Sequence, residues 1–281
     1  MKQAINPNQC TWPGDSRSAV AVTFDFDAES LWFSEKAINA RKPSVLSQGT
    51  YGPKVGLAKI LNVLKEFDVP ATFFVPGWTA ENHPVAVQSI AEAGHEIGHH
   101  GHLHKFIDPD KPDEEIEEME KGLAALDKVV GIKPAGYRAP AADSSDITIK
   151  LVHEYGFLYD SSFSDDDFPY RHSLENGKPG PIELPFHWHL DDSAISLFMM
   201  DYMPPIVPST HILELWKEEF TAMHEEGGLV MITLHPQIIG RPNRLKMLRE
   251  FLAFMRAHGD AWFSNCTDIA NAWQASTGES R

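Results

Sequence analysis

Five of the fourteen histidines lie within ten residues, in the segment GHEIGHHGHLH at positions 94–104. A neutral imidazole ring is the side chain that metal ions bind most often in proteins. His100 and His104 are four residues apart, the spacing at which one helical turn stacks two rings on one face. The cluster therefore predicts two ligands of one metal ion, and a third ligand has to come from elsewhere in the chain.

Two carboxylates, Asp25 and Asp27, follow an apolar run at residues 19–24 that is typical of a buried strand. Residues separated by one position in an extended chain point to the same side, so we expect these carboxylates to lie side by side. Adjacent carboxylates repel each other unless a cation binds one of them. Two histidines and one aspartate leave coordination positions open for water, which is typical of a catalytic rather than a structural metal.

Short apolar runs alternate with helical patterns along the whole chain. Strands are predicted at residues 19–24, 71–75, 135–138, 157–159, 182–184, 229–234 and 261–263, with one more leading into the histidine cluster. Helices are predicted at residues 57–67, 84–93, 112–130, 146–155, 211–225, 243–258 and 267–274. Asp146 is the expected N-cap of the helix that begins there. This alternation indicates a mostly parallel sheet in a single domain that spans residues 1–281.

About seven strand–helix units in 281 residues favour a distorted (β/α) barrel over an open doubly wound sheet. The stretch at about 160–208 is rich in Asp, Pro and aromatic residues, and we expect long loops there over one end of the barrel. Arg138, Asp160 and His235 each stand at the end of a predicted strand. Because all strands of a parallel barrel end at the same face, these side chains can meet the aspartates and histidines there.

Together these motifs resemble those of the polysaccharide deacetylase (NodB-homology) superfamily, over nearly the whole chain. The shared motifs are TFDFD (23–27), EIGHHGHLH (96–104), Arg138-Ala139-Pro140, Asp160-Ser161-Ser162 and TLHP (233–236). The resemblance implies a distorted (β/α) barrel that hydrolyses non-peptide carbon–nitrogen bonds with a bound divalent metal. Zinc is the expected metal, and two imidazoles with one carboxylate would also accept cobalt, nickel or iron.

The resemblance also implies a role for each residue at a matching position. Three residues correspond to metal ligands: Asp27, His100 and His104. Four correspond to catalytic residues: Asp25 is the base, Arg138 holds that base in place, His235 is the proton donor, and Asp160 tunes His235. In this alignment the other cluster histidines are bystanders, namely His95, His99 and His102. Most members have adjacent aspartates followed by glycine, whereas Phe26 separates the pair here and Glu29 lies nearby. Which aspartate is the base and which is the ligand therefore stays open.

The stretch IELPFHWHLDD at 182–192 looks like the branch of the superfamily that includes a bacterial peptidoglycan deacetylase and the cyclic imide hydrolases. Members of that branch lack secretion signals or form compact oligomers, so a homo-oligomer, tetramer or dimer, is expected. Pro140, His187 and Trp188 are predicted to contact the substrate, a small neutral amide, imide or amino sugar.

Three functions follow from the resemblance. The family's most frequent activity, removal of N-acetyl groups from amino sugars, is the expected function. An intracellular cyclic imide hydrolase, or a ring-opening amidohydrolase of the allantoinase kind, is the alternative. A catalytically silent metal-binding module is the second alternative, and it would require a closed coordination sphere.

Composition excludes several other classes of function. The formal net charge of −16 opposes binding to nucleic acid and to anionic membranes, since both carry phosphate. No apolar run approaches the roughly 18 residues that a membrane span needs. The polar N-terminal stretch does not look like a secretion signal, and two cysteines are too few for a disulfide framework. These features predict a cytoplasmic protein.

Overall fold

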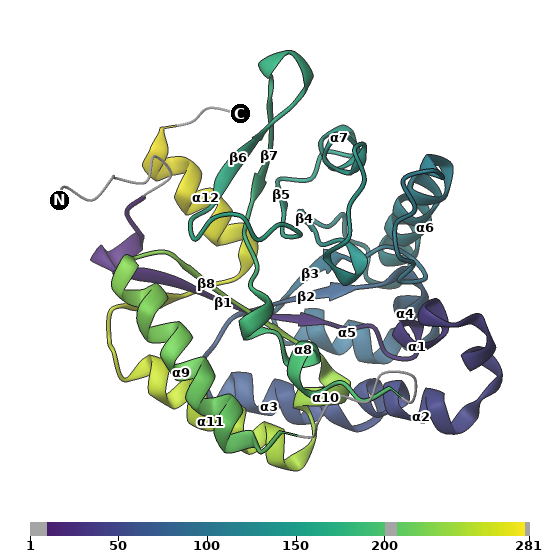
Figure 1. Cartoon of the computed structure of the whole chain (residues 1–281), viewed down its shortest axis with the longest axis horizontal. Helices are drawn as coiled ribbons and strands as arrows, with labels where there is room; N and C mark the ends of the chain where they lie inside the picture. The colour runs from purple at the N-terminus through teal and green to yellow at the C-terminus, as the bar shows by residue number, and fades with distance from the viewer. Residues whose placement is uncertain (1–9, 200–206, 279–281) are drawn as a thin grey trace.

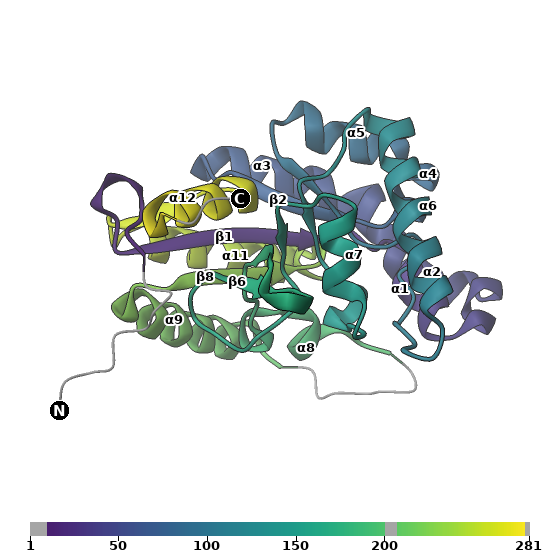
Figure 2. The same cartoon turned by 90° about the horizontal axis from the view of Figure 1, so that it is seen from above.

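The computed structural model describes residues 10–199 and 207–278, which form nine strands and twelve α-helices (Figures 1 and 2). The strands are β1 (Ser18–Asp25), β2 (Ala71–Val75), β3 (Glu96–His99), β4 (Gly136–Tyr137), β5 (Tyr159–Asp160), β6 (Tyr170–Ser173), β7 (Pro179–Glu183), β8 (Leu229–Leu234) and β9 (Ala261–Phe263). The first six helices are α1 (Ser30–Glu35), α2 (Pro43–Tyr51), α3 (Leu57–Phe67), α4 (Gly77–Asn82), α5 (Pro84–Glu92) and α6 (Pro112–Val130). The others are α7 (Thr148–Glu154), α8 (Asp192–Ser196), α9 (Ser209–Glu226), α10 (Pro236–Ile239), α11 (Pro242–Arg256) and α12 (Cys266–Thr277).

The strands form one curled sheet in the order β6-β7-β5-β4-β3-β2-β1-β8, and β9 also pairs with β1. Every pairing is parallel except that of β6 with β7, which form an antiparallel hairpin. A single parallel bridge between Asp191 and Thr233 joins the chain beyond β7 to β8, across the gap between the two ends of the sheet. The predicted distorted (β/α) barrel is confirmed.

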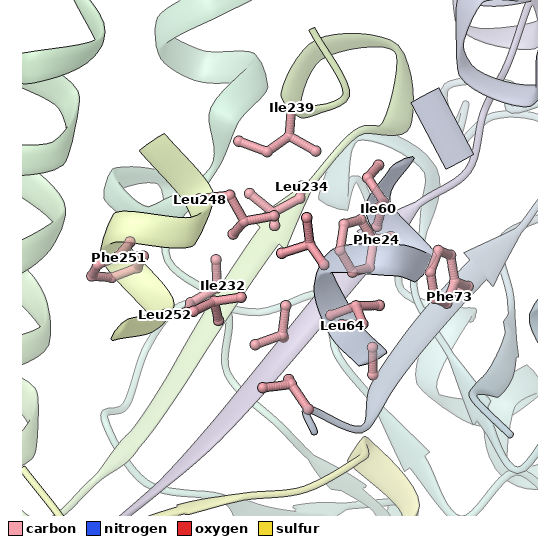
Figure 3. Packing of buried hydrophobic residues seen from close by; sticks show 14 of the residues in the cluster. Phe24, Ile60, Leu64, Phe73, Ile232, Leu234, Ile239, Leu248, Phe251 and Leu252 are labelled. Carbon is pink, nitrogen blue, oxygen red and sulfur yellow. The ribbon is translucent and has the colours of Figure 1, made fainter. Parts of the chain in front are cut away.

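Strand β1 lies at the centre of the molecule, with all eight of its residues buried. Figure 1 shows β1 and β8 running between α12 on one side and the pair α9 and α11 on the other. One face of β1 (Val20, Val22, Phe24) packs against the outer helices, where Leu64 of α3 and Phe251 of α11 also lie (Figure 3). The opposite face packs with α12. Burial on both faces explains why this strand reads as an unbroken apolar run.

Most predicted elements appear within a few residues of the predicted positions, and three differences bear on function. The helix predicted at 146–155 begins at Thr148 with Ile147 as its N-cap, so the N-cap prediction for Asp146 was wrong. The stretch predicted as long loops contains the β6–β7 hairpin and the short helix α8, while residues 200–206 lie outside the described chain. Helices α1 and α2, between β1 and α3, were not predicted. No helix within the described ranges is long and apolar enough to cross a membrane.

Candidate metal centre and active site

Asp27, His100 and His104 come together at the carboxyl ends of β1 and β3, and all three are buried. The Nε2 atoms of His100 and His104 lie 3.6 and 3.7 Å from Oδ1 of Asp27. Neither carboxylate oxygen of Asp27, nor Nε2 of His100, has a hydrogen-bond partner. Burying unpaired acceptors is costly unless a cation satisfies them. The three residues therefore fit a divalent metal ion.

The chain holds both histidines in the form that binds metals. The ring of His100 donates through Nδ1 to the carbonyl oxygen of Arg138, 2.7 Å away, which leaves the lone pair of Nε2 free. Burial lowers the pKa of His100 and lowers that of His104 to about 4, so both rings are neutral at physiological pH.

The two rings do not lie on a helix, so the prediction of a helical turn between them was wrong. Residues 100–104 form a loop in which Gly101 and His104 have φ angles of 66° and 57°, both in the left-handed region. The backbone carbonyls of Gly101 and His102 accept hydrogen bonds from the first residues of α4, which fixes the loop against that helix. The i to i+4 spacing is thus satisfied by a tight loop, and the loop brings both rings to Asp27.

Asp25 lies beside this triad but has a different partner. Its Oδ1 accepts a 2.8 Å hydrogen bond from the guanidinium group of Arg138, which is almost fully buried. Thr23 and Ser161 accept the remaining guanidinium hydrogen bonds and fix its plane. Burial opposes the charge on Asp25, but Arg138 and His100 outweigh it and lower the pKa of the carboxyl group. Asp25 is therefore an ionised carboxylate that can accept a proton.

His235 follows β8, and its Nε2 lies 3.7 Å from Oδ2 of Asp27. Its Nδ1 is 2.7 Å from Oδ1 of Asp192. Oδ1 of Asp191 lies 3.8 Å from the same nitrogen. Burial opposes protonation of the ring, but the hydrogen bond to Asp192 and the nearby carboxylates raise the pKa of His235 well above its ordinary value.

The prediction that Asp160 tunes His235 was wrong, because the carboxylate that bonds to His235 is Asp192. Asp160 accepts hydrogen bonds from Ser162 and also bonds to Glu183. The bridge beyond β7 instead delivers Asp191 and Asp192 to the end of β8. The adjacent acids in the segment HLDD (189–192) were the sequence signal for this pair.

A cavity of about 190 Å³ opens beside these groups. Its described polar lining consists of Asp25, Glu35, His104, Arg138, Asp191, Ser193, Thr233 and His235. Its apolar lining consists of Leu31, Phe106, Ala141, Ala142, Phe186, Trp188, Leu197 and Met199. Trp188, which is predicted to contact the substrate, is thus among the lining residues. Pro140 and His187 are not among its described lining residues; Pro140 lines a separate small hollow beside Gly101.

Other candidate ligands have partners elsewhere. Glu29 accepts hydrogen bonds from Thr50 and pairs with His83 at 2.7 Å. The ring of His99 bonds to the carbonyl oxygen of Met119. Since Glu29 is engaged, it does not fill the open positions around the Asp27, His100 and His104 triad.

Comparisons with known proteins identify the family of the chain. Residues 38–159 match the family model described as Polysaccharide deacetylase. The peptidoglycan deacetylase of Helicobacter pylori is 28% identical over 278 residues, which cover 90% of this chain and 94% of that protein.

Two crystal structures share the fold over nearly the whole chain. One, from Mycobacterium smegmatis and assigned to the polysaccharide deacetylases, is 42% identical with a TM-score of 0.90, over 94% of this chain and 92% of that one. The other, the PuuE allantoinase, is 27% identical with a TM-score of 0.82, over 99% of this chain and 96% of that one. With this fold, these motifs and these relatives, the chain belongs to the polysaccharide deacetylase family.

Proposed function

We propose that the protein is a metal-dependent hydrolase of small amides, and that ring opening of a cyclic imide or related cyclic amide is the reaction that its cavity fits best. The size and lining of the cavity carry this proposal. A polymer chain needs an open groove, whereas a cavity of about 190 Å³ with mostly apolar walls suits a small ring. The full-length likeness to an allantoinase supports the same reading.

Removal of an N-acetyl group from an amino sugar is the second candidate. The peptidoglycan deacetylase of Helicobacter pylori matches 90% of this chain, which favours it. Both reactions begin with water adding to an amide-type carbonyl, so the same polar residues serve either one. The silent module is the third candidate, and the partners of Glu29 count against the closed coordination sphere it requires.

Asp27, His100 and His104 would hold the metal, for which we propose zinc, with cobalt, nickel or iron as alternatives. When bound, the metal supplies polarisation of the substrate carbonyl and a lowered pKa for water. The unpaired oxygens of Asp27 favour it as the ligand, and the bond from Arg138 favours Asp25 as the base.

The chain's own groups then move the protons. Asp25, fixed by Arg138, accepts a proton from the attacking water. His235, held in its protonated form by Asp192, donates a proton to the leaving nitrogen. Both groups line the same cavity, so one bound substrate can meet both.

The first experiment is ring opening of a panel of five- and six-membered cyclic imides by metal-loaded protein, followed by loss of ultraviolet absorbance. Asp25→Asn should lower kcat by about 10²–10⁴-fold while metal analysis shows the ion still bound. Asp146→Asn makes the same chemical change at an exposed loop and should leave the rate unchanged.

Other outcomes would redirect the proposal. Loss of the metal in Asp25→Asn would show that the two aspartates have exchanged roles. Metal-loaded protein that opens no ring but releases acetate from an N-acetyl amino sugar would favour the second candidate. Failure of both reactions with metal bound would favour the silent module.

A further inference from the structure

A second hollow, of about 230 Å³, adjoins the catalytic cavity, since Leu197 lines both. It lies between Trp32 of α1, the segment after α8, and the start of α11 (Figure 1 shows α8 beside α10). The proposed reaction makes no use of it. Its volume is several times the roughly 30 Å³ that one water molecule occupies, so it has room for a small organic ligand.

Two buried hydrogen-bond donors of residues that line this hollow have no acceptor. They are Nε1 of Trp32 and Nη1 of Arg244. Trp32 is only 2% exposed. Leaving such donors unpaired costs free energy unless a ligand satisfies them. Gln237, which also lines the hollow, lies beside Asp27, so it stands between the hollow and the metal centre.

The hollow is positively charged in an otherwise acidic protein. Arg241 and Arg244 line it, and no described lining residue carries a carboxylate. They stand at the first turn of α11, a fifteen-residue helix whose N-cap side chain makes no capping hydrogen bond. The free amide groups and the helix dipole both favour an anion at this point.

Arg241 and Arg244 differ in whether their guanidinium groups are free to bind an anion. The guanidinium group of Arg241 stacks 3.7 Å above the ring of Tyr51. Arg244 uses Nη2 to donate to the carbonyl oxygen of Val207 and keeps Nη1 free. Burial lowers the pKa of Arg244, and the charge of Asp192 offsets only part of that effect. Arg244 is therefore the residue best placed to meet an anion.

We propose that this hollow binds a small organic carboxylate, held by Arg244 and the indole N–H of Trp32 at the start of α11. The remaining walls include Leu197, Phe198 and Ile238, which give apolar contact to a short carbon chain. Inorganic phosphate would gain nothing from such walls. A short-chain carboxylate uses both the charged and the apolar parts of the hollow.

Calorimetric titration of the metal-loaded protein with butyrate at low ionic strength tests the proposal. Arg244→Gln should weaken butyrate binding about tenfold or more, the effect of losing a charge-assisted hydrogen bond. Trp32→Phe keeps the aromatic wall, removes only the N–H donor, and should weaken it about fivefold. Arg249→Gln removes the same charge from an exposed position on α11 and should leave binding unchanged.

Binding at the metal centre is separated from binding in the hollow by His104→Gln, which removes a metal ligand and should retain butyrate binding. Absence of butyrate binding in the wild type would overturn the proposal. Equal affinity in wild type and Arg244→Gln, or equal weakening in Arg249→Gln, would do the same. Tighter binding of inorganic phosphate than of butyrate would overturn the assignment of an organic carboxylate.

Discussion

Two buried clusters in this molecule have the same composition, two carboxylates and one histidine each, yet they differ in their chemistry. The catalytic cluster consists of Asp191, Asp192 and His235, and the framework cluster consists of Asp160, Glu183 and His172. In the catalytic cluster the histidine bonds to Asp192 and its pKa is raised. In the framework cluster burial lowers the pKa of His172 and raises the pKa of both Asp160 and Glu183. The charge of Glu183 adds to the rise at Asp160, whereas the hydrogen bond from Asp160 opposes the rise at Glu183.

Access and hydrogen-bond partners explain the difference. Asp191 and His235 line the cavity beside the metal centre, where a substrate can take up a proton. Glu183 instead accepts the backbone N–H groups of Ser162 and Phe163, and Asp160 bonds to Ser162. Those bonds fix the loop whose Ser161 orients Arg138. In the proposed mechanism, the same residue types therefore serve proton transfer in one place and loop geometry in the other.

Asp192→Asn should break the catalytic cluster and give the largest effect. The amide cannot stabilise a charged imidazole, so kcat should fall by about 10²–10⁴-fold with the fold and metal content preserved. Steady-state kinetics together with metal analysis measure both quantities. A rate close to that of the wild type would show that His235 does not act as the proton donor.

The sequence allowed prediction of the parts of the site that lie next to strands. Asp25 ends a strand that is buried throughout, Asp27 follows it, and His235 follows another strand. The pairing of Asp192 with His235 joins positions 43 residues apart and depends on how the chain returns from β7 to β8. No local pattern encodes that path. A motif position pointed to Asp160 instead, whose carboxylate accepts hydrogen bonds from Ser162, while Asp192 is the partner of His235.

Glu183→Ala should break the framework cluster, with loss of stability as its main effect. Removing this fully buried carboxylate leaves the N–H group of Phe163 unpaired and takes away one of the two acceptors of the Ser162 N–H group and the partner of His172, at a cost of about 3 kcal/mol of unfolding free energy. Glu175→Ala, on the same hairpin but exposed, should change it by less than about 0.5 kcal/mol. Denaturant unfolding of both variants measures this. Equal losses would contradict a specific role for Glu183.

The pH dependence of stability sharpens the comparison further. Burial raises the pKa of Glu183 from 4.5 to about 7, so the folded protein keeps a proton that the unfolded chain releases. The resulting stabilisation is complete below pH 4.5 and is lost as the pH rises through 7. Relative to Glu183→Gln, the wild type should therefore lose roughly 1–3 kcal/mol over that interval, measured by urea unfolding at several pH values. A constant difference between the two proteins would show that Glu183 does not titrate there.

Asp160→Asn should have the smallest effect on both stability and kcat. It therefore tests most directly whether Asp160 belongs to the framework cluster or to the catalytic cluster. Burial and the neighbouring Glu183 raise the pKa of Asp160 well above its ordinary value, so it is a neutral acid that bonds to Glu183. An asparagine amide can donate the same bond to Glu183, and its one oxygen can keep one of the two hydrogen bonds that Ser162 donates to Asp160. Unfolding free energy should change by less than about 1 kcal/mol, and kcat by less than about threefold. A fall in kcat comparable to that of Asp192→Asn would restore Asp160 to the catalytic role that its motif position suggested, because no hydrogen bond in the framework cluster requires that loss.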